Sequence, residues 1–210
     1  MAEARKRGFF ITFEGGDGVG KTTQIKLLAK ALKNEGHRVF VTREPGGTPT
    51  GEVLRKLFKT QNMSPVTELM VLEASRAELC ENVLKPRLQK GEIILCDRFA
   101  ESSLVYQGAV RGLPLKMVGA ANQIATQGLK ADFIILLDAT TKDFASRLKT
   151  KSKKDRLDQA GMSFHEKVRK AFRKLAKADR RFRAYSANLD RQEIHAQILK
   201  DVQKVLKRHA

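Results

Sequence analysis

The residues with the clearest chemical potential lie close together near the N-terminus. Gly15, Gly20, Lys21 and Thr22 match the spacing G-x-x-x-x-G-K-[ST] of a phosphate-binding loop. Glycines let successive backbone N–H groups point into one concavity, which binds anions, and the helix that follows adds the positive end of its dipole. The lysine supplies a cation for the outer phosphates, and the threonine hydroxyl is a hard ligand for Mg²⁺.

An apolar strand-like run precedes this loop and a helical pattern follows it, which is the order that a phosphate site requires. A glycine-rich turn that only connects strand to helix is the structural alternative. We predict a nucleoside triphosphate site, bound with Mg²⁺ and formed by Gly15, Gly16, Asp17, Gly18, Val19, Gly20, Lys21 and Thr22.

Asp17 places a carboxylate inside this anion-binding loop, where it would repel a triphosphate. The charge is tolerable if the side chain points out of the loop, toward a hydroxyl of a second substrate or toward Mg²⁺. An aspartate that hydrogen-bonds its own backbone in a turn is the alternative. The loop therefore indicates two substrates, a phosphorylated donor and a hydroxyl-bearing acceptor.

A second pair of charged residues, Asp97 and Arg98, follows the apolar run 91–97. An apolar strand that delivers an aspartate to the triphosphate has the form of an acid that organises Mg²⁺. An aspartate that caps the next helix is the alternative. Arg98 favours the functional interpretation, because its planar fork of donors suits phosphoryl oxygens.

The elements that must position these residues alternate along the chain. Apolar patterning predicts strands at 9–13, 38–42, 91–97 and 132–138, with a weak fifth strand at 183–187. Apolar spacing together with helix start and stop signals predicts helices at 23–34, 50–60, 66–89, 114–127, 141–148, 163–177 and 190–207, the last of them opened by the capping pair Asp190 and Glu193. This alternation predicts a parallel sheet covered by helices on both faces. The basic run 149–156 is either a mobile lid over the triphosphate, which we favour, or a solvated basic loop.

Composition limits the possible classes of protein. A chain of 210 residues with 41% hydrophobic residues fits one α/β domain, 1–210. No apolar run approaches the length of a membrane span, the N-terminal run is too short for a signal peptide, and two cysteines suggest free thiols, so we expect a cytoplasmic protein. The net charge of +18 could indicate nucleic-acid binding, but the basic residues are spread along the chain without interleaved aromatics. An enzyme with polyanionic substrates also gains from such a field.

Several stretches together resemble the thymidylate kinase family: FITFEGGDGVGKTTQ, TREPGGTPTGEVLR, CDRFAESSLVYQG, GLKADFIILLD and KKDRLDQAGMSFHEKV. The resemblance implies a P-loop NTPase-like fold, α/β with a five-stranded parallel sheet, helices on both faces and a small mobile lid at about 147–161. It also implies a homodimer that phosphorylates dTMP to dTDP with ATP and Mg²⁺.

The resemblance also implies roles for individual residues. Lys21 contacts the β- and γ-phosphates, Asp17 accepts the 3′-hydroxyl of the monophosphate, and Tyr106 crowds the sugar so that deoxyribose is favoured. The acceptor phosphate lies among Arg43, Arg55 and Arg98, and the thymine base meets Arg76, Ser103 and Gln107. Mg²⁺ is associated with Thr22, Asp97 and Glu166.

Gly18 stands where some members of the family carry an arginine in the phosphate loop. The chain therefore resembles the bacterial type, which uses lid arginines instead. Here Lys151 stands at the lid position that is often arginine, and Lys151 and Arg156 would be the lid cations that act in catalysis. Leu72 stands where an aromatic residue that stacks on thymine is usual. A nucleotide kinase with a broader or different pyrimidine monophosphate acceptor is thus the alternative function.

Two other classes can be weighed from the sequence. A regulatory GTPase would read guanine with Asn-Lys-x-Asp, and that string does not occur. A basic nucleic-acid-binding module that holds ATP would bind with a steep salt dependence.

Overall fold

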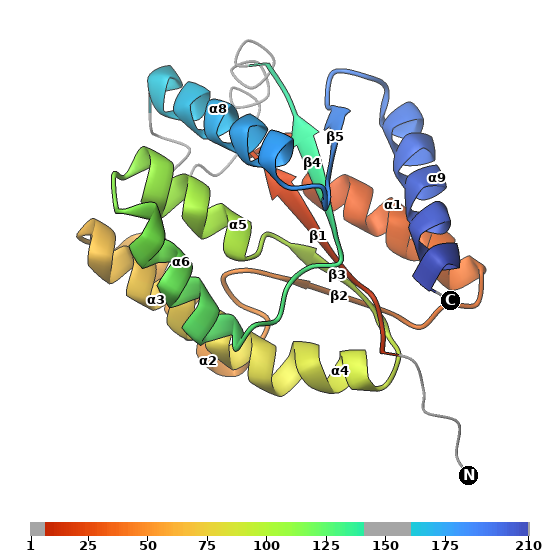
Figure 1. Ribbon diagram of the computed structural model, residues 1–210, viewed down its shortest axis with the longest axis horizontal. Coiled ribbons are helices and arrows are strands. Elements are labelled where there is room, and N and C mark those ends of the chain that lie inside the picture. The colour runs from red at the N-terminus through yellow and green to blue at the C-terminus, as the bar shows by residue number, and fades with distance from the viewer. Residues whose placement is uncertain (1–6, 141–160, 210) are drawn as a thin grey trace.

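The computed structural model describes residues 7–140 and 161–209. The predicted helix 141–148 and nearly all of the predicted lid, with Lys151 and Arg156, lie outside these ranges. Figure 1 shows a central sheet with helices packed on both of its faces. None of the helices in the described ranges is long and apolar enough to cross a membrane.

The sheet has five parallel strands in the order β2-β3-β1-β4-β5. Its strands are β1 (Phe10–Gly15), β2 (Val39–Arg43), β3 (Ile93–Asp97), β4 (Phe133–Asp138) and β5 (Phe182–Ser186). All six residues of β1 are buried, because the central strand of a sheet covered on both faces has no solvent-facing side. The predicted parallel five-stranded α/β fold is confirmed.

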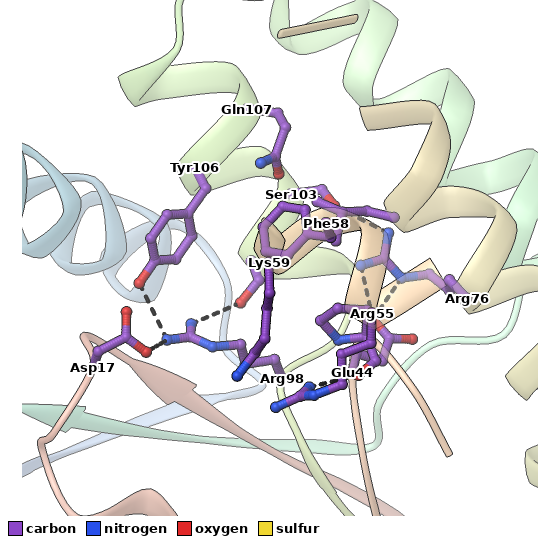
Figure 2. Close-up of a pocket in the computed structure, with 13 residues that line it drawn as sticks. Asp17, Glu44, Arg55, Phe58, Lys59, Arg76, Arg98, Ser103, Tyr106 and Gln107 are labelled. Atoms are coloured by element: carbon purple, nitrogen blue, oxygen red, sulfur yellow. Dashed lines mark hydrogen bonds and ion pairs between the residues drawn. The ribbon is translucent and has the colours of Figure 1, made fainter. Parts of the chain in front are cut away.

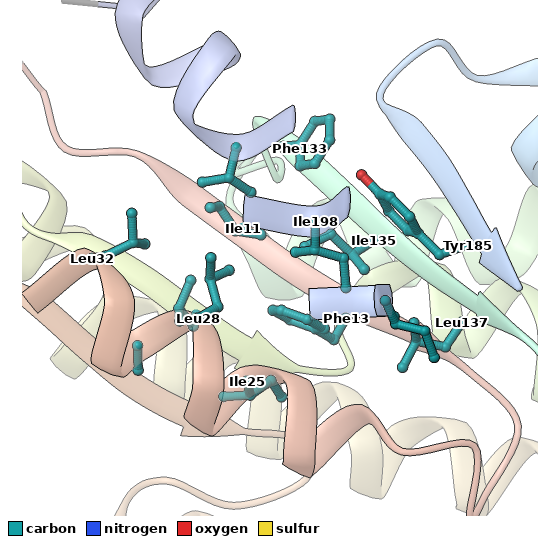
Figure 3. Packing of buried hydrophobic residues seen from close by; sticks show 14 of the residues in the cluster. Ile11, Phe13, Ile25, Leu28, Leu32, Phe133, Ile135, Leu137, Tyr185 and Ile198 are labelled. Carbon is teal, nitrogen blue, oxygen red and sulfur yellow. The ribbon is translucent and has the colours of Figure 1, made fainter. Parts of the chain in front are cut away.

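One face of the sheet is covered by α1 (Lys21–Asn34) and α9 (Arg191–His209). Figure 3 shows Ile11 and Phe13 of β1 against Ile25 and Leu28 of α1, with Ile198 of α9 close by. Leu28 and Ile198 are fully buried. The predicted spacing of apolar residues in both helices therefore places one stripe of each against the sheet.

The other face is covered by the chain between β2 and β3, by the segment after β3, and by α8 (Met162–Ala178). The first of these segments comprises α2 (Pro49–Thr60), α3 (Pro65–Leu79), a π-helical stretch (Cys80–Leu84) and α4 (Lys85–Gln89). The helix predicted at 66–89 is thus continuous, but its middle, Cys80–Leu84, is π-helical and not α-helical.

The segment after β3 is helical from α5 (Ala100–Ser103) through a second π-helical stretch (Leu104–Val110), and α6 (Leu115–Thr126) follows. The sequence did not predict helix at 100–110, because serines and a glycine have low helix propensity. Tertiary contacts compensate, since Tyr106 packs against Phe172 of α8 with ring centroids 6.1 Å apart.

The parallel arrangement brings the carboxyl ends of β1, β2 and β3 to one edge of the sheet. Asp97 lies beside Phe13 in the β1–β3 pairing and beside Arg43 in the β2–β3 pairing. Open α/β sheets bind ligands at this end of their strands, and two residues predicted to belong to the site, Arg43 and Asp97, lie there.

Candidate active site

The phosphate-binding loop leaves β1 at Gly15 and enters α1 at Lys21. A Cβ atom on Gly15 would lie 2.4 Å from the carbonyl oxygen of Leu137, so no other residue fits there. Gly20 caps α1 with a left-handed backbone (φ 99°), a conformation that glycine adopts without steric cost. These glycines let the loop turn sharply, so that the N-terminus of α1 faces the sheet edge.

Lys21 lies across this loop and is 7% exposed. Its Nζ donates to the carbonyl oxygens of Gly15 (3.3 Å) and Gly16 (2.7 Å), and Asp97 Oδ1 lies 4.0 Å away. Burial, and then the positive charge of Arg98, lower the pKa of Lys21 below its ordinary value. The side chain is held in place to meet an anion.

Thr22 and Asp97 offer oxygen ligands at one point. The Thr22 hydroxyl donates to Asp97 Oδ2 at 3.2 Å. Two hard oxygen groups suit Mg²⁺, which often takes one or two protein ligands and completes its shell with water and phosphate oxygens. In the described ranges no group of three or more acidic, histidine or cysteine side chains is placed to hold a metal ion.

Arg98 connects the phosphate loop to the neighbouring cavity. Its backbone has φ 73°, an uncommon left-handed conformation for arginine, held by a hydrogen bond from its N–H to Phe13 O (3.0 Å). The guanidinium donates to Asp17 Oδ1 (2.8 Å), Tyr106 Oη (3.2 Å) and Ser102 Oγ (3.2 Å). The left-handed backbone of Arg98 costs roughly 1–3 kcal/mol, and backbone conformations of this kind are characteristic of functional positions.

Glu14 supports this turn from inside the core. It is fully buried and accepts hydrogen bonds from Phe99 N–H (2.9 Å) and from the Ser102 hydroxyl (2.7 Å). Burial raises the pKa of Glu14 to about 8, although the charge of Arg98 opposes the shift. The carboxyl group thus fixes the backbone directly after Arg98.

A cavity of roughly 680 Å³, including solvent at its mouth, opens beside Arg98. Figure 2 shows Asp17 and Arg98 at one end, with Ser103 and Gln107 farther in. Its lining is Asp17, Glu44, Pro45, Arg55, Phe58, Lys59, Leu72, Arg76, Arg98, Ser102, Ser103, Tyr106 and Gln107.

A second cavity runs over the phosphate loop and shares residues with the first. Both are lined by Asp17, Glu44, Arg55, Lys59 and Arg98, and the second adds Lys21, Thr22 and Asp97. A group seated in the first cavity would therefore face a phosphate held by the loop. The geometry suits transfer between two ligands that meet at Arg98.

Arg76 forms the buried centre of the first cavity's wall and is 3% exposed. Its Nε donates to Glu44 Oε2 (2.9 Å), and its terminal nitrogens donate to Glu73, to Asn122 Oδ1 (2.7 Å) and to Phe99 O (3.2 Å). Burial raises the pKa of Glu44 to about 7, against the lowering effect of Arg76. The positive charge of Arg76 thus balances the negative charge of two buried carboxylates, Glu44 and Glu73.

Most of the residues selected from the sequence come together here. The first cavity gathers Asp17, Arg55, Leu72, Arg76, Arg98, Ser103, Tyr106 and Gln107, and the second includes Arg43. Arg43 is about half exposed and pairs with Glu52 at 2.9 Å. Glu166 lies on α8 and pairs with Lys170 at 3.7 Å, and it is absent from the described lining of either cavity.

Five residues that line the first cavity were not selected from the sequence: Glu44, Pro45, Phe58, Lys59 and Ser102. Helical spacing could have indicated Phe58 and Lys59, because they follow Arg55 by three and four residues on α2. Glu44 could have been indicated by its position, because it directly follows Arg43 at the end of a predicted strand, where α/β sheets bind ligands. Ser102 carried no signal, since its role depends on Glu14, which is distant in the sequence.

The parallel sheet and the glycine-rich loop at the end of β1 define a P-loop nucleotide-binding protein with a second ligand cavity. A family model for thymidylate kinase matches residues 13–198. The chain belongs to the thymidylate kinase family.

Individual relatives agree with this family over nearly the full chain. A thymidylate kinase of Caldanaerobacter subterraneus subsp. tengcongensis is 44% identical over 204 residues, which cover 96% of this chain and 98% of the relative. One from Deinococcus radiodurans is 43% identical, over 91% of this chain and 95% of the relative. A crystal structure of thymidylate kinase from Ehrlichia chaffeensis superposes with a TM-score of 0.78 at 32% identity, over 94% of this chain and 99% of the other.

Proposed function

We propose that the protein transfers the γ-phosphoryl group of ATP to dTMP and forms dTDP. The observation that carries the proposal is the junction of the two cavities at Asp17 and Arg98. Membership of the thymidylate kinase family supports the identity of both substrates. In this proposal ATP phosphates occupy the loop Gly15–Thr22, and dTMP occupies the first cavity.

Positioning and charge neutralisation account for most of the catalysis, because phosphoryl transfer through a loose transition state needs little covalent chemistry. Lys21 neutralises charge on the outer phosphates, and Arg98 presents its fork to the acceptor phosphate. Thr22 and Asp97 would hold Mg²⁺, which supplies further charge neutralisation on the phosphates when bound.

Asp17 and Arg98 pair with each other at 2.8 Å. We infer that the acceptor phosphate takes over donors of Arg98, while Asp17 accepts the 3′-hydroxyl of the sugar. Arg55 and Arg43 add positive charge at the cavity junction. Leu72 and Phe58 provide apolar surface for the base, and Arg76, Ser103 and Gln107 provide its polar contacts.

We also propose that one kinase domain spans 1–210, with a lid at about 147–161 that contributes Lys151 and Arg156 to catalysis. Glu166, on the helix after this segment, would assist Mg²⁺ or closure. The two cysteines of the chain, Cys80 and Cys96, are free and buried, which supports a reducing compartment such as the cytoplasm.

Exposed apolar side chains on α3 and α6, on the acceptor side of the molecule, support a homodimer. Met70 of α3 is 47% exposed, and Leu115 and Ile124 of α6 are 55% and 78% exposed. These two helices pack side by side on the same side of the sheet (Figure 1). Light scattering after size exclusion tests the dimer, and Ile124→Glu should shift it toward monomer.

The decisive experiment measures ADP release with ATP and Mg²⁺ against dTMP, dUMP, TMP with a ribose sugar, dCMP, dGMP and dAMP. A strong preference for dTMP supports the proposal. Comparable kcat/KM values across pyrimidines would assign a broader nucleotide kinase. ATP binding without acceptor-dependent ADP release would contradict the proposed reaction.

A further inference from the structure

Glu68 is a buried carboxylate next to the first cavity, in which the acceptor dTMP is proposed to bind and which is called the acceptor cavity from here on. It lies on α3 four and eight residues before Leu72 and Arg76, so all three occupy one face of the helix. Only 1% of its side chain is exposed. A buried charge needs partners, and those of Glu68 connect it to the cavity.

The two carboxylate oxygens of Glu68 have different partners. Oε2 accepts a hydrogen bond from Arg111 Nη2 at 2.9 Å, and Oε1 accepts one from Gln107 Nε2 at 2.8 Å. An arginine only donates and an ionised carboxylate only accepts. Gln107 must therefore turn its NH₂ group toward Glu68, because the opposite orientation would set two acceptors against each other.

This constraint determines what Gln107 presents to the ligand. Gln107 lines the cavity and is 2% exposed. Figure 2 shows its amide oxygen on the side of Ser103. Glu68 engages one of the two N–H donors of the amide, and the amide oxygen on the side of Ser103 is then the acceptor that Gln107 offers to a ligand.

We propose that Glu68 is a positioning residue that fixes the amide of Gln107 and thereby selects bases with an N–H at ring position 3. Thymine and uracil carry that donor, whereas cytosine presents an acceptor there. The inference rests on the proposed function, since it assumes that a pyrimidine monophosphate occupies the cavity. It adds a residue outside the lining, together with Arg111, to the determinants of specificity.

The test is Glu68→Gln, which keeps size and removes charge. Arg111 still requires an acceptor, so the single carbonyl oxygen of the new side chain faces Arg111 and its NH₂ faces Gln107. Gln107 then turns over and presents N–H to the cavity. The ratio of kcat/KM for dTMP to that for dCMP should fall about tenfold to hundredfold, because a mismatched buried polar pair is costly.

Two comparisons separate this role from a structural one. The dTMP to dUMP ratio should stay within twofold, because both bases carry the same N–H. Glu81→Gln, at an exposed helical carboxylate that pairs with Lys85, should leave both ratios unchanged. Loss of stability alone would lower activity toward all acceptors together and leave the ratios intact.

A double-mutant cycle with Gln107→Met completes the test. Glu68→Gln should have no further effect on the dTMP to dCMP ratio once Gln107 is removed. An unchanged ratio in Glu68→Gln, with the parent protein active on dTMP, would overturn the inference but keep the proposed function. A parent protein with no dTMP-dependent ADP release would instead overturn the function itself.

Discussion

Replacing Arg76 by methionine tests the buried charge cluster in the wall of the acceptor cavity. Methionine keeps the apolar length of the side chain but leaves Glu44 and Glu73 without their shared cation. Both carboxylates are buried, with 6% of each residue exposed. Breaking a buried ion pair by removing one partner costs about 3–5 kcal/mol, and we expect Arg76→Met to lower the free energy of unfolding by that amount at pH 8.

The effect should depend on pH in a defined direction. Burial raises the pKa of Glu44 from its ordinary value of 4.5 to about 7 while Arg76 lowers it, so loss of Arg76 raises it further. A group with a raised pKa in the folded state binds more protons there than in the unfolded chain, and stability falls as pH rises through that window. In the parent protein this fall in the free energy of unfolding ends at about pH 7, where Glu44 ionises in the folded state. In the variant the pKa of Glu44 is higher, so the free energy of unfolding continues to fall above pH 7 by about 1.4 kcal/mol per pH unit.

Urea denaturation at pH 5.5 and pH 8, followed by circular dichroism, measures both effects. The penalty at pH 8 should exceed that at pH 5.5 by about 1.4 kcal/mol. Arg43→Met is the control, because Arg43 and Glu52 are an exposed pair worth less than about 1 kcal/mol. A variant of Arg76 as stable as the parent at pH 8 would refute the assignment of Arg76 as the compensating charge.

Four further changes have defined outcomes. Lys21→Ala should lower kcat by about 100-fold or more, because it removes charge at the transferring group; unchanged turnover excludes that role. Asp17→Asn should raise KM for dTMP more than for ATP; the reverse would assign Asp17 to Mg²⁺. Glu14→Gln should flatten the decline in stability from pH 4.5 to about 8 that its raised pKa predicts, as urea midpoints would reveal; an undiminished slope argues against it. Leu28→Ala should cost about 2–5 kcal/mol in the same assay, and a loss below 1 kcal/mol would contradict its packing.

Local sequence signals predicted the five strands of the sheet and its long helices. The three central strands, β1, β3 and β4, are short apolar runs, whereas β2 and β5 at the sides of the sheet are mixed in character. The loop from Gly15 to Thr22 was predictable because its function depends on residue type at fixed spacing. The segment 100–110 was missed because its helical form depends on contacts with α8 and with Glu14, which propensity does not include.

The site was predictable only in part, because its decisive contacts join distant residues. Arg98 reaches Asp17 across 81 positions, and Arg76 reaches Glu44 across 32. The left-handed backbone of Arg98 has no signal in the residue type, since arginine seldom adopts it. The family resemblance supplied roles for these residues, but it did not indicate that two carboxylates share Arg76 or that Glu68 holds Gln107.

The layout of the sheet separates two kinds of evolutionary change. The groups placed near the phosphates come from the ends of β1 and β3, whose spacing is locked by the β1–β3 pairing at Phe13 and Asp97. Residues around the base come from α2, α3 and the helical segment after β3, which can be altered without moving that pairing. Substitutions on these helices can therefore change which base the acceptor carries, while the residues that carry out phosphoryl transfer stay the same.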